Sequence, residues 1–484
     1  MREIRTRFAP SPTGYMHIGN LRTAIYEYLV AKSQNGKFIL RIEDTDQERY
    51  VEGAIEVIYN TMHSVGLHYD EGPDVGGDYG PYTQSERKGI YKEYAHRLVE
   101  QGGAYFCFCS KDRLDNLRKE CESRKEAFRY DGHCQQLSKE EIDQRLNNNE
   151  PYVVRQKVPQ GGTTSFTDLV YGTITVENSQ LDEGVLLKAD GMPTYNFANV
   201  IDDHLMQITH VVRGSEYLSS TPKYNLVYQA FGWEIPDYIH LPPIMKTAEK
   251  KLSKREGDAS FEDFVNKGYL KEAIVNYIVL LGWNPGTNEE FFTLDELIQI
   301  FSLQGLSKSP AIFDPNKLRW MNGEYIRRMS LEKFHALATP YYTELNGSSV
   351  DQMKLSKLLQ QRTEVLSEIP EKIDFLAQLP DYNVEMYINK KMKTNLSDSL
   401  EHLKEVKEVL AGVNNWEFAD IHDSLFELVN TLGVKNGQIL WPLRTAVSGK
   451  DVSPGGGVEL AELMGKQETL RRIEIGIDKL AQIS

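Results

Sequence analysis

The spacing of apolar residues predicts that the chain opens with a strand, a helix and a second strand. Residues 2–9 alternate with the two-residue period of a strand. From Gly19 to Leu29, apolar residues recur three and four positions apart, which predicts a helix that ends at Asn35. The mostly apolar run 38–42 is typical of a buried parallel strand. Together the three segments predict a βαβ unit.

Further along the chain, the pattern changes twice. Between about 85 and 200 it is broken by cysteines and short β-prone runs, at 172–176 and 184–187, which we interpret as an inserted domain. Strand-like runs at 208–212 and 238–240 are expected to continue the first sheet. The last third repeats apolar residues at helical spacing, as in Leu400, Leu403 and Val406, and predicts an all-helical domain. We therefore expect three domains, formed by residues 1–85 with 200–330, by 86–199 and by 331–484.

Length and composition limit the class of protein. A chain of 484 residues suggests about two to four domains. With 40% hydrophobic and 26% charged residues, it has the composition of a folded chain, which excludes disorder as its main state. No run approaches the roughly 18 apolar residues of a membrane helix, and residues 1–12 lack the apolar core of a signal peptide. We therefore expect a cytoplasmic protein with no membrane association.

Charge and cysteine content narrow the class further. Acidic residues outnumber basic ones by 70 to 55, for a net charge of −15. This excess argues against a protein that coats nucleic acid through bulk positive charge, but it is compatible with a locally basic groove. The four cysteines all fall between Cys107 and Cys134, unlike a disulfide framework spread over a secreted domain. Their clustering indicates either a metal site or reduced thiols.

The start of the first helix is a candidate phosphate site. The motif G-x-x-x-x-G-K-[ST] is absent and no G-x-G-x-x-G follows the first strand, which disfavours P-loop hydrolases and dinucleotide enzymes. Instead, His17 and Gly19 stand where backbone N–H groups and the helix dipole favour an anion. A histidine can donate a hydrogen bond to a phosphate oxygen, and a glycine lets a nucleotide approach the backbone.

A second candidate element is a cationic segment. Residues 250–255, Lys-Lys-Leu-Ser-Lys-Arg, carry four cations in six positions. Lysines on a polar loop can approach a polyphosphate leaving group and offset the negative charge that develops on it. An exposed basic loop without a ligand is the alternative.

Together the two elements resemble the HIGH and KMSKS motifs of class I aminoacyl-tRNA synthetases. Longer strings resemble the glutamyl-tRNA synthetase branch of that class, over nearly the whole chain and most strongly before residue 330. Asn20 replaces the last histidine of HIGH, a variation that this branch tolerates. The strings are Arg7-Phe8-Ala9-Pro10-Ser11-Pro12-Thr13-Gly14, Leu40-Arg41-Ile42-Glu43-Asp44-Thr45-Asp46 and Pro193-Thr194-Tyr195-Asn196-Phe197-Ala198-Asn199-Val200-Ile201-Asp202-Asp203.

The resemblance implies a fold and a reaction. The fold would be α/β, with a Rossmann-like class I synthetase catalytic domain, an inserted α+β acceptor-binding domain and an all-α anticodon-binding domain. The reaction would be ATP-dependent activation of L-glutamate, with Mg²⁺, to glutamyl adenylate, followed by transfer to the 3′ end of tRNA(Glu). Such catalysis requires positioning and charge stabilisation and no protein nucleophile.

Three other functions were weighed. Glutaminyl-tRNA synthetase is the nearest enzyme, but its C-terminal part is expected to be a β-barrel, whereas residues 331–484 predict helices. A catalytically silent, synthetase-like RNA-binding protein would not need His17, Glu43, Arg213 and Lys254 together. A truncated tRNA-modifying relative would lack the helical domain.

Motif matches with the family assign residues to parts of the site. His17 and Lys254 are expected to be catalytic. Specificity for glutamate requires a guanidinium, because a carboxylate taken from water must be paired and arginine offers a bidentate fork. Glu43 would pair with the substrate ammonium. The expected ATP-binding residues are Pro10, Ser11, Thr13, Gly14, His17, Gly19, Asn20, Glu216, Lys251, Ser253, Lys254 and Arg255. The expected glutamate-binding residues are Arg7, Ala9, Ser11, Glu43, Tyr195 and Arg213.

The cysteine segment resembles the zinc knuckle of many family members. Gln136 stands where the C-x-H form of the knuckle has a histidine, so the fourth ligand is open between Tyr130, His133 and Cys121. A vestigial knuckle with reduced thiols is the alternative, and any zinc here would be structural. The candidate ligands are Cys107, Cys109, Tyr130 and Cys134.

The resemblance also bears on the tRNA. Arg362 is a candidate for reading the third anticodon base, on which charging of tRNA(Gln) in addition to tRNA(Glu) would depend. The family further implies a monomer, and an enzyme that activates glutamate only once tRNA is bound.

Overall fold

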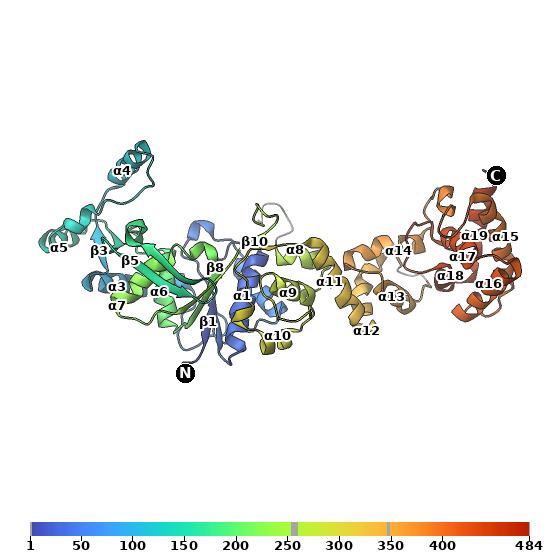
Figure 1. The fold of residues 1–484 in the computed structure, drawn as a ribbon, viewed down its shortest axis with the longest axis horizontal. Coiled ribbons are helices and arrows are strands. Elements are labelled where there is room, and N and C mark those ends of the chain that lie inside the picture. Colours follow the sequence, from blue (N-terminus) through green and yellow to red (C-terminus); the bar gives the residue numbers. More distant parts are fainter. Residues whose placement is uncertain (1, 253–259, 346–348, 484) are drawn as a thin grey trace. The chain divides into compact units, whose positions relative to one another are not determined.

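The computed structural model describes residues 2–252, 260–345 and 349–483 (Figure 1). The chain forms two compact units. The first comprises residues 1–265 and 274–314, and the second comprises 266–273 and 315–484. The domain boundaries drawn from the sequence, including those of the insertion, stay a prediction.

The first unit opens with the predicted βαβ unit. Strands β1 (Arg5–Phe8) and β2 (Lys37–Leu40) pair in parallel, and helix α1 (Ile18–Lys32) connects them. The strands and α1 bury their apolar side chains almost completely, as expected of a central parallel pair. The predicted order of strand, helix and strand is confirmed.

A four-stranded sheet of order β6-β5-β9-β8 lies next to β1. The parallel strands β8 and β9 confirm the predicted strands at 208–212 and 238–240. The amide of Thr209 donates to the carbonyl of Arg5 at 2.9 Å, which joins the start of β8 to β1. Strand β6, assigned to the insertion from the sequence, belongs to this sheet through β5, which meets β9 at Asp168. The strands are β5 (Thr163–Asp168), β6 (Gly172–Glu177), β8 (His210–Gly214) and β9 (Asp237–Leu241).

The cysteine segment belongs to a smaller, antiparallel sheet of order β3-β4-β7. Helices α3, α6 and α7 share a buried apolar core with it, and α5 packs Ile142 and Leu146 against the same core, whereas α4 extends away from it (Figure 1). The strands are β3 (Ala104–Cys107), β4 (Val153–Gln156) and β7 (Val185–Leu187). The helices are α3 (Lys88–Glu100), α4 (Lys111–Ser123), α5 (Lys139–Asn147), α6 (Tyr195–Leu205) and α7 (Thr221–Phe231).

The other elements of the first unit flank the βαβ unit and the four-stranded sheet. Two short strands pair in parallel, β10 (Ile244–Met245) and β11 (Ala311–Ile312). The helices are α2 (Ala54–Ser64), α8 (Phe261–Asn266), α9 (Lys271–Leu280) and α10 (Leu294–Ile300). The chain passes from the first unit to the second within α8 and returns to the first within α9.

The described part of residues 331–484 contains helices and no strand of a sheet, which confirms the helical prediction. Leu403, Val406, Ile473 and Ile477 lie in one buried apolar core, as their spacing predicts. No helix among the described residues of the whole chain is long and apolar enough to cross a membrane. The helices of this unit are α11 (Pro315–Arg328), α12 (Leu331–Ala338), α13 (Gln352–Gln360), α14 (Ile369–Ala377), α15 (Leu396–Gly412), α16 (Phe418–Leu432), α17 (Asn436–Ser448), α18 (Gly457–Met464) and α19 (Lys466–Ala481).

Candidate active site

A pocket of about 370 Å³ opens at the carboxyl ends of β1, β8 and β9, beside the start of α1. The carboxyl ends of parallel strands are the usual ligand position in α/β folds. Of the predicted site residues, Gly14 does not line the pocket, and Ser253, Lys254 and Arg255 lie outside the described residues. The predicted residues that the structure brings together here are Arg7, Ala9, Pro10, Ser11, Thr13, His17, Gly19, Asn20, Glu43, Tyr195, Arg213, Glu216 and Lys251.

His17 caps the start of α1, and its hydrogen bond fixes which ring nitrogen carries the proton. Its Nδ1 accepts from the amide of Gly19 at 2.9 Å, so the neutral ring carries its proton on Nε2, as a donor. A Cβ at Gly19 would lie 3.0 Å from that Nδ1. Glycine therefore lets the cap form, and it keeps the backbone of the helix start accessible to a ligand.

The described residues on either side of 253–259 are held by backbone contacts. On one side, the amide of Leu252 donates to the carbonyl of Ile244 at 3.1 Å. On the other side, Ser260 forms a β-bridge with His17, and the amide of Phe261 donates to the carbonyl of Met16 at 3.0 Å. The chain thus enters this segment beside β10 and leaves it beside the start of α1, both at the pocket.

Arg213, at the end of β8, is a buried cation held by neutral groups. Its Nε donates to Nε2 of His240 at 3.2 Å, and its Nη2 donates to the hydroxyl of Thr221 at 2.7 Å. Three tyrosine rings surround the guanidinium with centroids 4.6–5.3 Å away, those of Tyr217, Tyr224 and Tyr238. Within the described chain, no carboxylate forms an ion pair with Arg213. A carboxylate ligand would supply the missing opposite charge.

Arg7 differs from Arg213, because the protein already pairs it. Its Nε donates to Asp203 and its Nη1 to Glu27, both at 3.0 Å. Asp203 also accepts from Arg41 at 2.8 Å. Burial on its own would raise the pKa of Asp203, but Arg7 and Arg41 outweigh it and lower that pKa, so this carboxylate is ionised.

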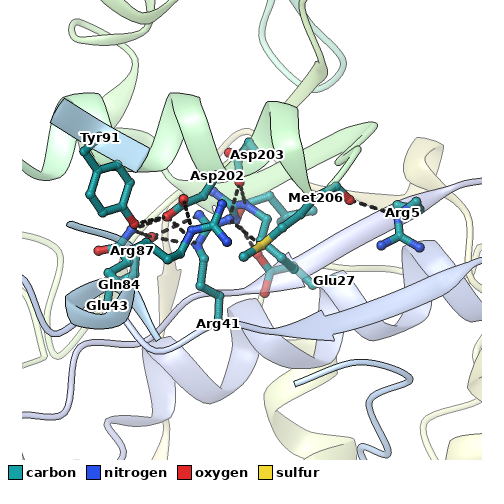
Figure 2. A network of polar contacts seen from close by, with 12 residues as sticks. Arg5, Glu27, Arg41, Glu43, Gln84, Arg87, Tyr91, Asp202, Asp203 and Met206 are labelled. Carbon is teal, nitrogen blue, oxygen red and sulfur yellow. Dashed lines mark hydrogen bonds and ion pairs between the residues drawn. The ribbon is translucent and has the colours of Figure 1, made fainter. Parts of the chain in front are cut away.

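The same buried network continues to Glu43 (Figure 2). Oε1 of Glu43 accepts from Arg41 at 3.0 Å and from Gln84 at 3.4 Å. No described residue donates to its Oε2, and the side chain lines the pocket. Burial raises the pKa of Glu43. A cationic ligand group would therefore find an under-compensated carboxylate here. Further along the network, Asp202 accepts from Arg87 at 2.7 Å and from Tyr91 at 2.8 Å.

Sequence reasoning missed several residues of this site. Arg22 lines the pocket, donates to the carbonyls of Leu281 and Pro242, and has its pKa lowered by burial. Because Arg22 lies within the apolar stretch of α1, helical spacing gives no sign that it reaches the pocket. Asp168 and His240, which stand behind Arg213, likewise carry no motif.

The candidate zinc ligands come together in the structure. The Sγ atoms of Cys107, Cys109 and Cys134 lie within 4.8 Å of one another, with Cys109 and Cys134 3.5 Å apart. The hydroxyl of Tyr130 lies 3.4 Å from Sγ of Cys107 and 3.2 Å from Sγ of Cys109. Metal–sulfur bonds of about 2.3 Å in a tetrahedron place two sulfurs about 3.8 Å apart, so the donor set fits zinc. Among the described residues, His133 and Cys121 are not part of this cluster.

The surroundings of the cluster favour the thiolate, the form that binds metal, at Cys107, whereas the pKa of Cys134 is raised by its hydrogen bond to Cys107 and by burial. A hydrogen bond from Cys134, reinforced by Tyr130 and Arg155, lowers the pKa of Cys107 to about 4. The guanidinium of Arg155 donates to Cys107 at 3.4 Å, and that of Arg113 donates to Cys109 at 3.5 Å. These two cations would offset the negative charge of a zinc ion bound by three thiolates.

Comparison with known proteins agrees with this geometry. Residues 3–320 match the family described as tRNA synthetases class I (E and Q), catalytic domain, and residues 333–477 match an anticodon binding domain. Glutamate–tRNA ligases of Clostridium tetani and of Clostridium botulinum strain Hall are each 62% identical over 478 residues, which cover 99% of this chain and 98% and 99% of those proteins.

A solved structure is also similar. The glutamate tRNA ligase from Elizabethkingia meningosepticum, in complex with its amino acid, is 35% identical, covers 99% of this chain and 100% of its own, and superposes with a TM-score of 0.90. The chain therefore belongs to the class I tRNA synthetases (E and Q), and within them to the glutamate–tRNA ligase family.

Proposed function

We propose that this chain is a glutamate–tRNA ligase, which activates L-glutamate with ATP and transfers it to the 3′ end of tRNA(Glu). One observation carries the proposal: the pocket presents a buried guanidinium that pairs with no carboxylate of the described residues, Arg213, and an under-compensated carboxylate, Glu43. A ligand with one carboxylate for Arg213 and one ammonium for Glu43 satisfies both charges. Glutamate is such a ligand, and its second carboxylate remains for the reaction.

The amino-acid side of the site follows from these contacts. Arg213 would take the side-chain carboxylate of glutamate, because its planar fork offers parallel donors to two oxygens. Arg7 is neutralised by Glu27 and Asp203, so its proposed share in the pocket is one of shape and hydrogen bonding through its remaining amino group. We place Ala9, Ser11 and Tyr195 in the same subsite. Ala9 and Ser11 belong to the turn after β1, and Tyr195 begins α6.

The nucleotide side would use the start of α1. Its backbone N–H groups, its dipole and the Nε2–H of His17 favour phosphate oxygens. An oxygen of the α-carboxylate of glutamate attacks the α-phosphorus of ATP. A bond forms between that oxygen and the phosphorus, and the bond from the phosphorus to pyrophosphate breaks. A terminal hydroxyl of tRNA then attacks the acyl carbon and releases AMP. The chain's part is to orient the reactants and to stabilise charge.

The remaining nucleotide contacts are proposed from the motif match. We assign Lys251 and Glu216, which line the pocket, to ATP, together with Ser253, Lys254 and Arg255, which lie outside the described residues. Pro10, Thr13, Gly14 and Asn20 complete that subsite. Mg²⁺ would accompany ATP, with phosphate and water oxygens as most of its ligands.

Zinc is proposed as a structural ion. Cys107, Cys109, Cys134 and Tyr130 would hold it, and it would tie β3 to the segment before α5. The fold of this small sheet would then gain the free energy of metal binding.

Several finer properties are also proposed. Arg362 is exposed and donates to the carbonyl of Pro454, and we retain it as a candidate anticodon contact that bears on charging of tRNA(Gln). We propose a monomer that activates glutamate only with tRNA bound; exchange of ATP and pyrophosphate without tRNA would contradict this order. Because its proposed substrates are ATP, free glutamate and tRNA, we place its activity in the cytoplasm.

Aminoacylation tests the proposed function directly. The purified chain, ATP and Mg²⁺ are incubated with labelled glutamate and with either a tRNA(Glu) or a tRNA(Gln) transcript, and labelled glutamine serves as the control amino acid. Charging of tRNA(Glu) with glutamate is expected. Charging of both transcripts with glutamate would identify an enzyme of wider tRNA range, and charging of neither would refute the proposal.

A further inference from the structure

Behind Arg213 lies a buried chain of polar contacts that reaches out of the pocket to Asp168. We infer that His240 and Asp168 are positioning residues that set the specificity of the pocket for a carboxylate over its amide, by holding Arg213 in one orientation. The inference rests on the proposed function, since it takes Arg213 to be the partner of the side-chain carboxylate of glutamate.

Asp168 acts only as an acceptor. Its Oδ1 accepts from the amides of Val170 and Tyr171, at 2.9 and 2.7 Å. Its Oδ2 accepts from the amide of His240 at 3.1 Å and lies 2.6 Å from Nδ1 of the same residue. With three backbone N–H groups donating to its two oxygens, this fully buried carboxylate serves as an acceptor toward the imidazole as well.

Asp168 therefore fixes the tautomer of His240. Because Asp168 cannot donate, the proton between the two groups belongs to Nδ1 of the imidazole. On the other side of the ring, Nε of Arg213 can only donate, so Nε2 of His240 must accept. The ring is therefore neutral, with its one N–H proton on Nδ1. Burial, with Arg213 nearby, lowers the pKa of His240, in agreement with that state.

This arrangement holds Arg213 without neutralising it. Nε is used by His240 and one N–H of Nη2 is used by Thr221, so Nη1 and the second N–H of Nη2 form the fork that faces a ligand. A carboxylate bonded directly to Arg213 would compete with the substrate. The neutral imidazole instead places the negative charge of Asp168 one ring further away, where it offsets the buried cation and leaves its outer donors for the ligand.

A fixed fork discriminates between a carboxylate and an amide. Two oxygens accept from both outer donors, whereas an amide accepts with one oxygen and sets its own N–H against a donor. If Arg213 could rotate, it would adjust to the amide, and the difference between glutamate and glutamine would shrink. The inferred role of His240 and Asp168 is to prevent that rotation.

Two amide substitutions at His240 separate this role from a merely structural one. His240→Gln retains an acceptor at the distal position, where Nε2 meets Arg213. His240→Asn is shorter and retains only a donor toward Asp168. For the full-length chain, we would measure kcat and KM for glutamate, KM for ATP, and the ratio of kcat/KM for glutamate over glutamine in tRNA charging.

His240→Asn is expected to raise KM for glutamate about 10- to 100-fold and to lower the discrimination ratio about tenfold, because a hydrogen bond to the charged Arg213 is lost. KM for ATP should stay within about twofold of wild type, because the loss affects one subsite only. His240→Gln is expected to restore most of both effects. Equal behaviour of the two variants, or a parallel rise in both KM values, would overturn the inference.

Two further results keep the test decisive. If His240→Asn does not fold, Asp168→Asn provides the second variant. It keeps an oxygen for the backbone amides and sets an NH2 donor against Nδ1 of His240, so it is expected to lower the discrimination ratio in the same way, and an unchanged ratio would overturn the inference. A wild-type chain that charges no tRNA with glutamate would refute the proposed function itself, whereas normal charging with undiminished discrimination in the variants would refute only the role of His240 and Asp168.

Discussion

Replacing Asp203 with asparagine should destabilise the first unit strongly, although the shape of the side chain is kept. Asp203 is 4% exposed, and its Oδ1 accepts from Arg7 at 3.0 Å and from Arg41 at 2.8 Å. Asparagine removes the charge that both guanidinium groups face, although its single amide oxygen can still accept from both, so the loss is one of charge. Removing one partner of a buried ion pair typically costs about 3–5 kcal/mol, because the remaining charge cannot be solvated.

The cost should appear as faster amide exchange in β1, which carries Arg7, and in β2, which Arg41 directly follows. Under conditions where exchange reports the opening equilibrium, about 3 kcal/mol corresponds to a rate increase of roughly 100-fold or more. Hydrogen exchange of peptides covering β1 and β2, read by mass spectrometry, measures this change for the first unit alone. The matched control is Glu234→Gln, which alters the exposed pair of Glu234 with Arg2 and should change protection by less than about threefold.

If Asp203→Asn and Glu234→Gln gave the same protection in β1 and β2, the reasoning would fail. It would mean that water or a shift of Arg7 and Arg41 compensates the lost charge. The exposure of both arginines, 3% and 0%, leaves little room for either compensation.

Three other substitutions test the cysteine cluster, an ion pair of α19 and the cationic segment. Elemental analysis should find about one zinc per chain in wild type and in Cys121→Ser, whereas Cys134→Ser should lose most of its zinc. The same zinc content in Cys134→Ser as in wild type would exclude the cluster as the site. Hydrogen bonds led by Arg471 lower the pKa of Glu468 to about 2, so its stabilisation is complete above about pH 4.5 and is lost as the pH falls toward 2. The gap in urea midpoint between wild type and Glu468→Gln should therefore narrow from pH 6 to pH 3, and a constant gap would contradict this. Lys254→Ala should abolish activation in single-turnover assays while tRNA binding by filter retention persists, and wild-type turnover would refute its role.

The local sequence pattern was sufficient to predict an element wherever the residues of that segment alone determine whether it forms a helix or a strand. The βαβ unit at 2–42 was predictable because each segment has the period of its own type, and the buried stripe of Leu403 and Val406 follows helical spacing. The cap at the start of α1, which we propose to bind phosphate, was predictable for a similar reason, since His17 and Gly19 are close in the sequence.

What could not be predicted are contacts between buried polar groups from distant segments. Arg213 and His240 are 27 residues apart, and His240 and Asp168 are 72 residues apart. Each sits on a strand with ordinary spacing, and a polar side chain on a buried strand leaves no periodic trace of its partner. Strand pairing has the same difficulty. The sequence shows β6 as a strand, but not that β5 attaches it to β9.

The position of Asp168 has a consequence for any attempt to exchange modules between relatives of this chain. A chimera cut at residues 85 and 200 would replace the whole predicted insertion as if it were a separable part. Such a cut would also remove Asp168, whose carboxylate contacts Nδ1 of His240 behind the pocket. Transplants that keep the hairpin of β5 and β6 with its recipient, and exchange only the small sheet with its cysteines, would leave the amino-acid pocket in its original sequence context.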